Sequence, residues 1–143
     1  MALNPGDLTV LVNYAICLNF AGRSEEAIPL FQKTIRLNPV GLYYSYLSNF
    51  HLGNALMFTG RYEEAVSAYK KAIQRNPHSI WGHVMLTATY SMMGREKEAR
   101  AQAAEVLRIN PRYSADFFAK TSLIKEQSVR DKVFNALRKA GLK

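Results

Sequence analysis

Residues 52–77 read LGNALMFTGRYEEAVSAYKKAIQRNP, and this stretch decides the fold. Gly60 separates two segments whose apolar residues recur at helical spacing. Glycine ends the first segment because it tolerates the left-handed conformation, and Pro77 ends the second because the residue before a proline avoids the helical region. Glu63 and Glu64 suit the start of a helix, and Ala65 is small enough for close helix packing. The stretch therefore predicts two antiparallel helices joined by a tight turn.

The same pattern recurs along the chain. Asn-Pro pairs place prolines at positions 5, 39, 77 and 111, so the spacings are 34, 38 and 34 residues. In the same register stand Gly22-Arg23 with Ala27, Gly60-Arg61 with Ala65, and Gly94-Arg95 with Ala99. A 34-residue period is typical of solenoids built from helix pairs. The 38-residue spacing indicates about one extra turn in the third helix, around residues 40–46.

These positions resemble the signature of the tetratricopeptide-repeat (TPR) family. The matching residues are Leu11, Tyr14, Ala15, Leu18, Ala27, Phe31 and Pro39, then Leu52, Gly53, Leu56, Ala65, Tyr69 and Pro77, then Leu86, Tyr90, Ala99 and Pro111. The third copy departs from the pattern at Thr87 and Ala103, and His83 stands where the family prefers tryptophan. The resemblance implies an all-α fold, a right-handed TPR superhelix of antiparallel helix pairs (an α-solenoid), and a role in binding other proteins.

The chain divides at the repeat boundaries. We expect helix pairs at 8–20 with 24–37, 42–58 with 62–75, and 79–92 with 96–109. The repeats are then 8–41, 42–79 with a lengthened first helix, and 80–113, followed by capping helices in 114–143 at about 114–121 and 127–140. Residues 1–7 are interpreted as the tail of a truncated preceding repeat, since Pro5 stands one period before Pro39. Truncation predicts an open apolar face near Leu8, Leu11 and Ala15, through which a homodimer is an alternative to a monomer.

The placement of charge favours a neutral binding groove. The chain carries 19 Lys and Arg against 11 Asp and Glu, a net charge of +8. Residues 8–22, 38–60 and 76–94 nevertheless contain no charged residue. In TPR proteins the first helices of the pairs line a concave groove, so the resemblance implies a groove that is neutral and rich in aromatic and amide side chains.

The family positions give a set of candidate groove residues. They are Thr9, Val12, Asn13, Ile16, Leu47, Phe50, His51, Asn54, Trp81, Val84, Met85 and Ala88. Trp81 and Phe50 are the expected anchors, because aromatic residues dominate binding hot spots, and Asn13 and Asn54 are expected to hydrogen-bond a peptide backbone. Core packing is the alternative for Val12, Ile16 and Val84. Val12, Trp81 and Met85 occupy slots where chaperone-binding relatives carry their carboxylate clamp, so we do not expect an acidic chaperone tail to bind tightly there.

The sequence gives little support for a catalytic site or a metal site. No nucleophile motif or glycine-rich phosphate loop appears, so we expect a non-enzyme without a cofactor. His51, His78 and His83 are read as surface or groove residues rather than metal ligands, and Cys17 as a small buried side chain. No apolar run could span a membrane, and the first residues do not form a signal peptide, so a cytoplasmic location is expected.

Two further readings of the sequence concern its partners. The ending Leu137-Arg138-Lys139-Ala140-Gly141-Leu142 resembles the C-terminal TPR region of bacterial class III adenylate cyclase-type multidomain proteins. The resemblance implies, as the alternative function, an accessory, regulatory or oligomerisation domain of a signalling enzyme. Basic residues at 70–71, 108, 112 and 138–139 are interspersed with glutamates, so we interpret them as a solvated helix surface rather than a nucleic-acid site.

Overall fold

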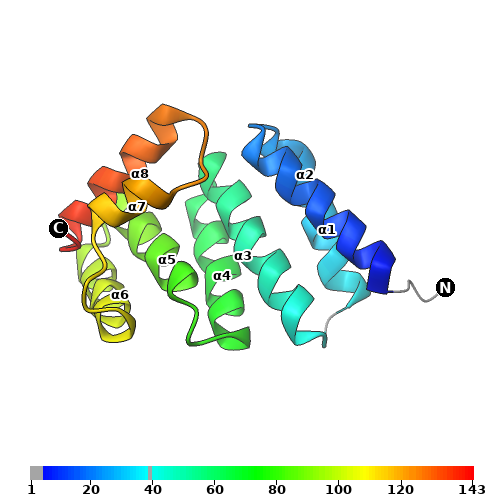
Figure 1. The fold of residues 1–143 in the computed structure, drawn as a ribbon, viewed down its shortest axis with the longest axis horizontal. Helices are drawn as coiled ribbons and strands as arrows, with labels where there is room; N and C mark the ends of the chain where they lie inside the picture. The colour runs from blue at the N-terminus through cyan, green and yellow to red at the C-terminus, as the bar shows by residue number, and fades with distance from the viewer. Residues whose placement is uncertain (1–4, 39) are drawn as a thin grey trace. The chain divides into compact units, whose positions relative to one another are not determined.

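The protein is all-helical in its computed structural model (Figure 1), which describes residues 5–38 and 40–143. These residues form eight α-helices and no strand. The helices are α1 (Pro5–Phe20), α2 (Ser24–Leu37), α3 (Leu42–Phe58), α4 (Tyr62–Arg75), α5 (Ile80–Met92), α6 (Glu96–Ile109), α7 (Ala115–Thr121) and α8 (Gln127–Lys139). Residues 1–4 of the predicted tail, and the predicted helix-ending Pro39, lie outside the described residues.

The helix bounds follow the sequence prediction closely. The main difference lies at the front, where α1 begins at Pro5 rather than at residue 8. Proline is well suited to a first helical position, because the amide hydrogen that it lacks would have no intrahelical partner there. The third helix, α3, has 17 residues and α5 has 13, a difference of about one turn.

The chain divides into two compact units, Met1–Pro77 and His78–Lys143. In the first unit, called unit 1 below, α1 packs against α2 and α3, and α3 packs against α2 and α4. In unit 2, α5 packs against α6 and α8, and α7 packs against α8. Figure 1 shows the helix pairs of each unit running alongside one another.

Each helix pair is joined by the same turn. Gly22, Gly60 and Gly94 have φ of 82°, 81° and 75°, which confirms their role as helix ends. In each turn the amide of the following arginine donates to a carbonyl of the preceding helix, for example Arg61 N to Leu56 O at 2.8 Å. The glycine amide donates to a second carbonyl, Met57 O in that turn, at 3.1 Å. These paired bonds satisfy carbonyls that a helix end would otherwise leave open.

The second helices of the first two pairs contribute small and aromatic side chains to the core. Alanine and aromatic side chains are buried at matching positions, Ala27 and Phe31 in α2, and Ala65 and Tyr69 in α4. A Cβ atom added to Gly53 would lie 2.6 Å from the Tyr69 ring, so this glycine allows α3 and α4 to approach closely. The small residues of the repeat are therefore packing residues.

Unit 2 closes on its own C-terminal residues. Gly141 has φ 107°, and Leu142 N donates to Leu137 O at 3.0 Å, which repeats the bond pattern of the three other turns. Leu137 and Leu142 are fully buried, and Leu142 O accepts from Ala115 N at 2.9 Å. The chain end thus ties α8 to the start of α7.

Candidate functional site

Eight of the predicted groove residues lie on the first helices of unit 1, and six of them have side chains that are exposed or partly buried. Thr9, Asn13 and Ile16 are on α1, and Leu47, Phe50 and His51 are on α3. Thr9 and Asn13 are exposed, and the other four are partly buried. The Thr9 hydroxyl is hydrogen-bonded to the Tyr44 hydroxyl of α3, which brings the two helices together on this side. We call these six residues the first-helix face.

Aromatic rings lie beside one another along α3. The Tyr46 and Phe50 rings are stacked with centroids 6.1 Å apart, and the Phe50 ring lies 6.0 Å from the buried Tyr69 ring of α4. Because Phe50 is only partly buried, its ring joins the interior of unit 1 to its surface. The face therefore offers rigid apolar area with no charged side chain among its members.

His51 is held by aromatic rings from three helices. Its ring stacks on Phe31 at 6.1 Å and meets Phe20 and Phe50 edge-on at 6.0 and 5.1 Å. Among the described residues its buried Nδ1 atom has no hydrogen-bond partner. Burial lowers the pKa of His51 from 6.5 to about 4, because the charged imidazolium loses its hydration there. His51 is therefore neutral at pH 7 and supports the face from within.

The structure corrects the role of Val12 and Asn54. Val12 is fully buried where α1 packs against its neighbours, so its side chain has no open surface for a ligand. Asn54 is also buried, and its Oδ1 accepts a hydrogen bond from the Tyr69 hydroxyl at 2.6 Å. Its oxygen thus satisfies an internal donor instead of a peptide backbone. No sequence motif signals this bond, although the tyrosine of this repeat stands where the first repeat has Phe31.

In unit 2 the predicted groove residues separate into one exposed aromatic residue and a buried group. Trp81 is 40% exposed. Val84, Met85 and Ala88 are buried, which corrects their assignment as ligand contacts, because α5 packs against α6 and α8 in its own unit. Of this set, Trp81 alone keeps an exposed side chain.

The open apolar surface of α1 lies on a different side from the one predicted. Leu8 and Ala15 are buried and Leu11 is partly buried, whereas Val10 and Tyr14 are 70% and 55% exposed. Cys17 is exposed too, so its prediction as a buried side chain is wrong. Val10, Tyr14 and Cys17 recur at helical spacing and form an exposed stripe, called the α1 stripe below.

Further exposed apolar residues surround the start of α3. Val40, Leu42 and Tyr43 are 81%, 64% and 67% exposed. The predicted groove residues do not include these three, although the extra residues in the 38-residue proline spacing indicated this region. Leu42 and Tyr43 stand in the first turn of the lengthened helix α3, where their apolar side chains stay accessible.

His83 of unit 2 and the basic residue Arg108 have structural partners. His83 is buried and its Nδ1 atom lies 2.9 Å from Gln102 Oε1, which corrects its reading as a surface or groove residue. Within residues 5–38 and 40–143, no group of His, Cys, Asp and Glu side chains could hold a metal ion, and no helix is long and apolar enough to cross a membrane. Arg108 pairs with Glu105 at 2.9 Å, as a solvated helix surface would.

Comparison with known proteins agrees with this architecture. Residues 56–120 match a family model described as a tetratricopeptide repeat. A solved mutant of MamA is 25% identical, with a TM-score of 0.66 over 74% of this chain and 74% of that chain. The chain has the tetratricopeptide-repeat fold. No curated protein matches it.

Two other solved structures have a similar fold. A thermophilic TPR protein from Thermus thermophilus is 21% identical, with a TM-score of 0.63 over 93% of this chain and 72% of that one. The structure of a CopN–Scc3 complex contains a chain that is 14% identical, with a TM-score of 0.67 over 93% of this chain and 70% of that chain.

Proposed function

We propose that this protein is a non-catalytic scaffold that binds a peptide or helix of a partner protein on the first-helix face of unit 1. The observation that carries the proposal is the partly exposed Phe50 ring, supported by Tyr46 and Tyr69 within a surface that has no charged residue. A rigid aromatic side chain supplies contact area at low entropic cost, as binding hot spots require. Asn13 is exposed on the same face and offers an amide for backbone hydrogen bonds.

The solved relatives are consistent with this proposal. One of the similar chains comes from a structure of a complex between CopN and Scc3. TPR-type helix pairs present a regular surface to a partner, and neighbouring pairs extend that surface. Trp81 of unit 2 is proposed as a second contact, which single variants test independently of Phe50.

The test is a pull-down from the source cell with the wild-type chain, the Phe50→Ala variant and the Trp81→Ala variant. Leu123→Ala is the matched control, because Leu123 is an apolar side chain that is 72% exposed between α7 and α8. We expect a partner that is captured by the wild type and the control and lost with Phe50→Ala at unchanged helicity. Equal capture by all four proteins would contradict the site.

We further propose that the α1 stripe supports self-association. Val10 and Tyr14 place apolar area on an open surface, and Cys17 lies on the same stripe. In a two-fold dimer built on the stripe, mild oxidation would join two copies through Cys17. A Tyr14→Ser variant should then sediment as a monomer and lose the crosslink. Monomeric wild-type protein at high concentration would exclude the dimer.

The second candidate function is an accessory domain of a larger signalling enzyme such as an adenylate cyclase. The C-terminal hexapeptide is the basis of this proposal, and its Leu137, Gly141 and Leu142 close unit 2. Because these residues already have a structural task, they do not by themselves require such a relationship. The reading frame upstream of the chain decides this point: a cyclase domain followed by repeats supports the proposal, and an unrelated frame removes it.

A further inference from the structure

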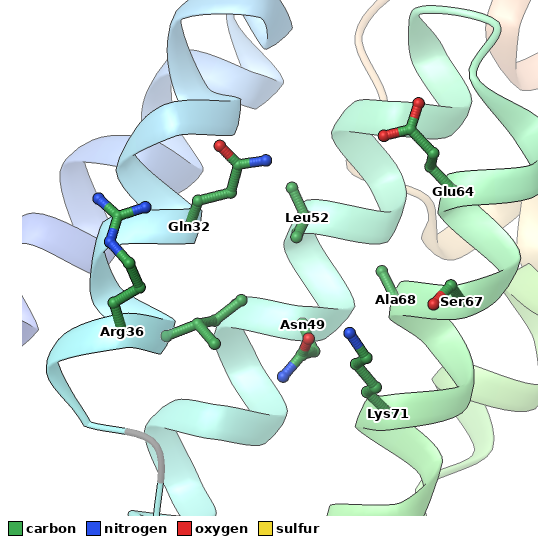
Figure 2. A pocket seen from close by; sticks show the side chains of 9 residues that line it. Gln32, Arg36, Asn49, Leu52, Glu64, Ser67, Ala68 and Lys71 are labelled. Atoms are coloured by element: carbon green, nitrogen blue, oxygen red, sulfur yellow. The ribbon is translucent and has the colours of Figure 1, made fainter.

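A hollow lies on unit 1 between α2, α3 and α4 (Figure 2). Its volume is about 540 Å³, which falls within the range of ligand-binding clefts. The lining residues are Gln32, Ile35, Arg36, Asn49, Leu52, Glu64, Ser67, Ala68 and Lys71. None of them belongs to the first-helix face, so the hollow is a separate surface of the molecule.

Two cations line the hollow from opposite sides. Figure 2 shows Arg36 on α2 and Lys71 on α4, with Asn49 of α3 between them. Both side chains are exposed, and neither has an ion pair or hydrogen bond among the described residues. Glu64 is the acidic lining residue, and its carboxylate is already held by Arg61 through contacts of 3.0 and 2.8 Å. The hollow therefore offers unneutralised positive charge at its Arg36 and Lys71 end.

The floor of the hollow combines an amide with apolar side chains. Asn49 is 4% exposed, and its Nδ2 donates to Ser45 O at 2.7 Å, which leaves the Oδ1 atom as an acceptor. Leu52 and Ala68 supply buried apolar surface beside it. An extended peptide presents the complementary groups, a backbone amide donor for Asn49 and side chains for the apolar floor and the cations.

We propose that this hollow is a second binding site, which takes an acidic segment of a partner protein with an apolar side chain flanked by carboxylates. The carboxylates lie at the Arg36 and Lys71 end and away from Glu64, because like charges repel. The apolar side chain covers Leu52 and Ala68, and Asn49 accepts from the peptide backbone. The site goes beyond the proposed function, since it uses the second helices and charge rather than the neutral first helices.

A nucleic acid fits the lining less well. Single strands bind through aromatic side chains that stack on the bases, and the lining contains none. An anionic membrane would contact protruding cations and make no use of a recessed amide such as Asn49. Both alternatives are outcomes of the experiment below.

The test measures fluorescence anisotropy of a labelled synthetic peptide in which leucine alternates with glutamate, added to the complete chain. Reversing both cations, Arg36→Glu with Lys71→Glu, should weaken binding at least about tenfold. Each exposed charge pair contributes modestly, but the double reversal replaces two attractions with two repulsions. The matched control reverses Lys125 and Lys132, which are exposed in unit 2 and change the net charge equally. The control should bind as the wild type does.

A second variant tests the hollow without changing charge. Ser67→Trp places a bulky side chain at the exposed lining of α4 and should displace the peptide about as strongly as the charge reversal. Equal loss in the control pair, unchanged binding in Ser67→Trp, or no binding by the wild type would overturn the proposal. Equal or tighter binding of a single-stranded oligonucleotide, or of phosphatidylserine vesicles, through Arg36 and Lys71 would also overturn it. Phe50→Ala should leave peptide binding unchanged, so this test and that of the proposed function fail independently.

Discussion

Helices α1 and α3 occupy the same place in successive repeats, yet they bury different faces. When the sequences are aligned at Gly22 and Gly60, three residues of α1 share their repeat positions with three of α3: Val10 with Ser48, Tyr14 with Leu52, and Cys17 with Ala55. The three α1 residues are exposed, whereas Ser48, Leu52 and Ala55 are 0%, 8% and 0% exposed. The face of α3 is covered because α1, α2 and α4 all pack against this helix, whereas in unit 1 α1 packs against α2 and α3.

The difference teaches that repeat position alone does not determine burial. Both helices are uncharged between their glycines and their preceding prolines, apart from Asp7 in the first turn of α1, and both satisfy the repeat signature. Which of their faces lies inside depends on which helices stand next to them. Matched substitutions at equivalent positions can therefore separate the effect of a helix's own sequence from the effect of the helices that pack against it.

The largest expected effect compares Leu52 with Tyr14. Leu52→Ala removes a buried side chain and should lower the free energy of unfolding by about 2–5 kcal/mol, since it leaves a cavity. In dilute, monomeric protein, Tyr14→Ala changes an exposed side chain at the equivalent position and should cost less than about 0.5 kcal/mol. Urea unfolding followed by circular dichroism measures both. Equal losses would show that the α1 stripe is covered in solution.

The next effect compares His51 with its equivalent, Asn13, and depends on pH. The unfolded chain binds a proton at His51 below pH 6.5, but the folded chain does so only below about 4. Stability therefore falls as the pH drops through this window, by about 2 kcal/mol between pH 7 and pH 5. Urea unfolding at these two pH values should show the loss in the wild type and not in His51→Phe.

Asn13→His is the control for that measurement. Residue 13 is exposed, so a histidine there should titrate alike in the folded and unfolded chains and add no dependence on pH. Unchanged wild-type stability between the two pH values would mean that the His51 ring reaches water in the folded protein.

A smaller effect compares Gly53 with Ala15. Gly53→Ala would place a Cβ atom 2.6 Å from the Tyr69 ring, so we expect a loss of about 1–3 kcal/mol from overpacking. Ala15 already carries this Cβ atom at the equivalent position, where it is fully buried. Thermal unfolding of Gly53→Ala with and without Tyr69→Phe separates the ring clash from the hydroxyl bond to Asn54. A stabilised Gly53→Ala variant would contradict the close approach of α3 and α4.

The smallest effect compares Cys17 with Ala55. Because Cys17 is exposed in the single chain, an aromatic disulfide reagent should modify it in dilute, monomeric folded protein, with a stability change within about 0.5 kcal/mol. A Cys17→Ser, Ala55→Cys variant places the thiol where the side chain is fully buried, so it should react after unfolding. Reaction rates with and without urea measure the difference. Slow modification of native Cys17 would indicate that another surface covers it.

The candidate site was predictable in part. The uncharged first helices and the aromatic residues of α3 are visible in the sequence, and Phe50 and Trp81 keep accessible ring surface. Five other candidates are buried instead: Val12, Asn54, Val84, Met85 and Ala88. The sequence could not predict this, because an uncharged helix does not show which of its residues a neighbouring helix covers. The hollow was not predictable, since Arg36, Asn49 and Lys71 come from three helices and share no sequence motif.

The sequence by itself determined the features whose causes lie within one or two turns of the chain. Glycines with positive φ end the first helices at Gly22, Gly60 and Gly94, and asparagine–proline pairs follow the second helices, so the helix bounds and the repeat follow from local geometry. Only the tertiary structure decided which faces are buried, why His51 is neutral, and where α2, α3 and α4 leave a hollow. Burial, desolvation and cavity shape are properties of packed neighbours, and residues distant in sequence supply them.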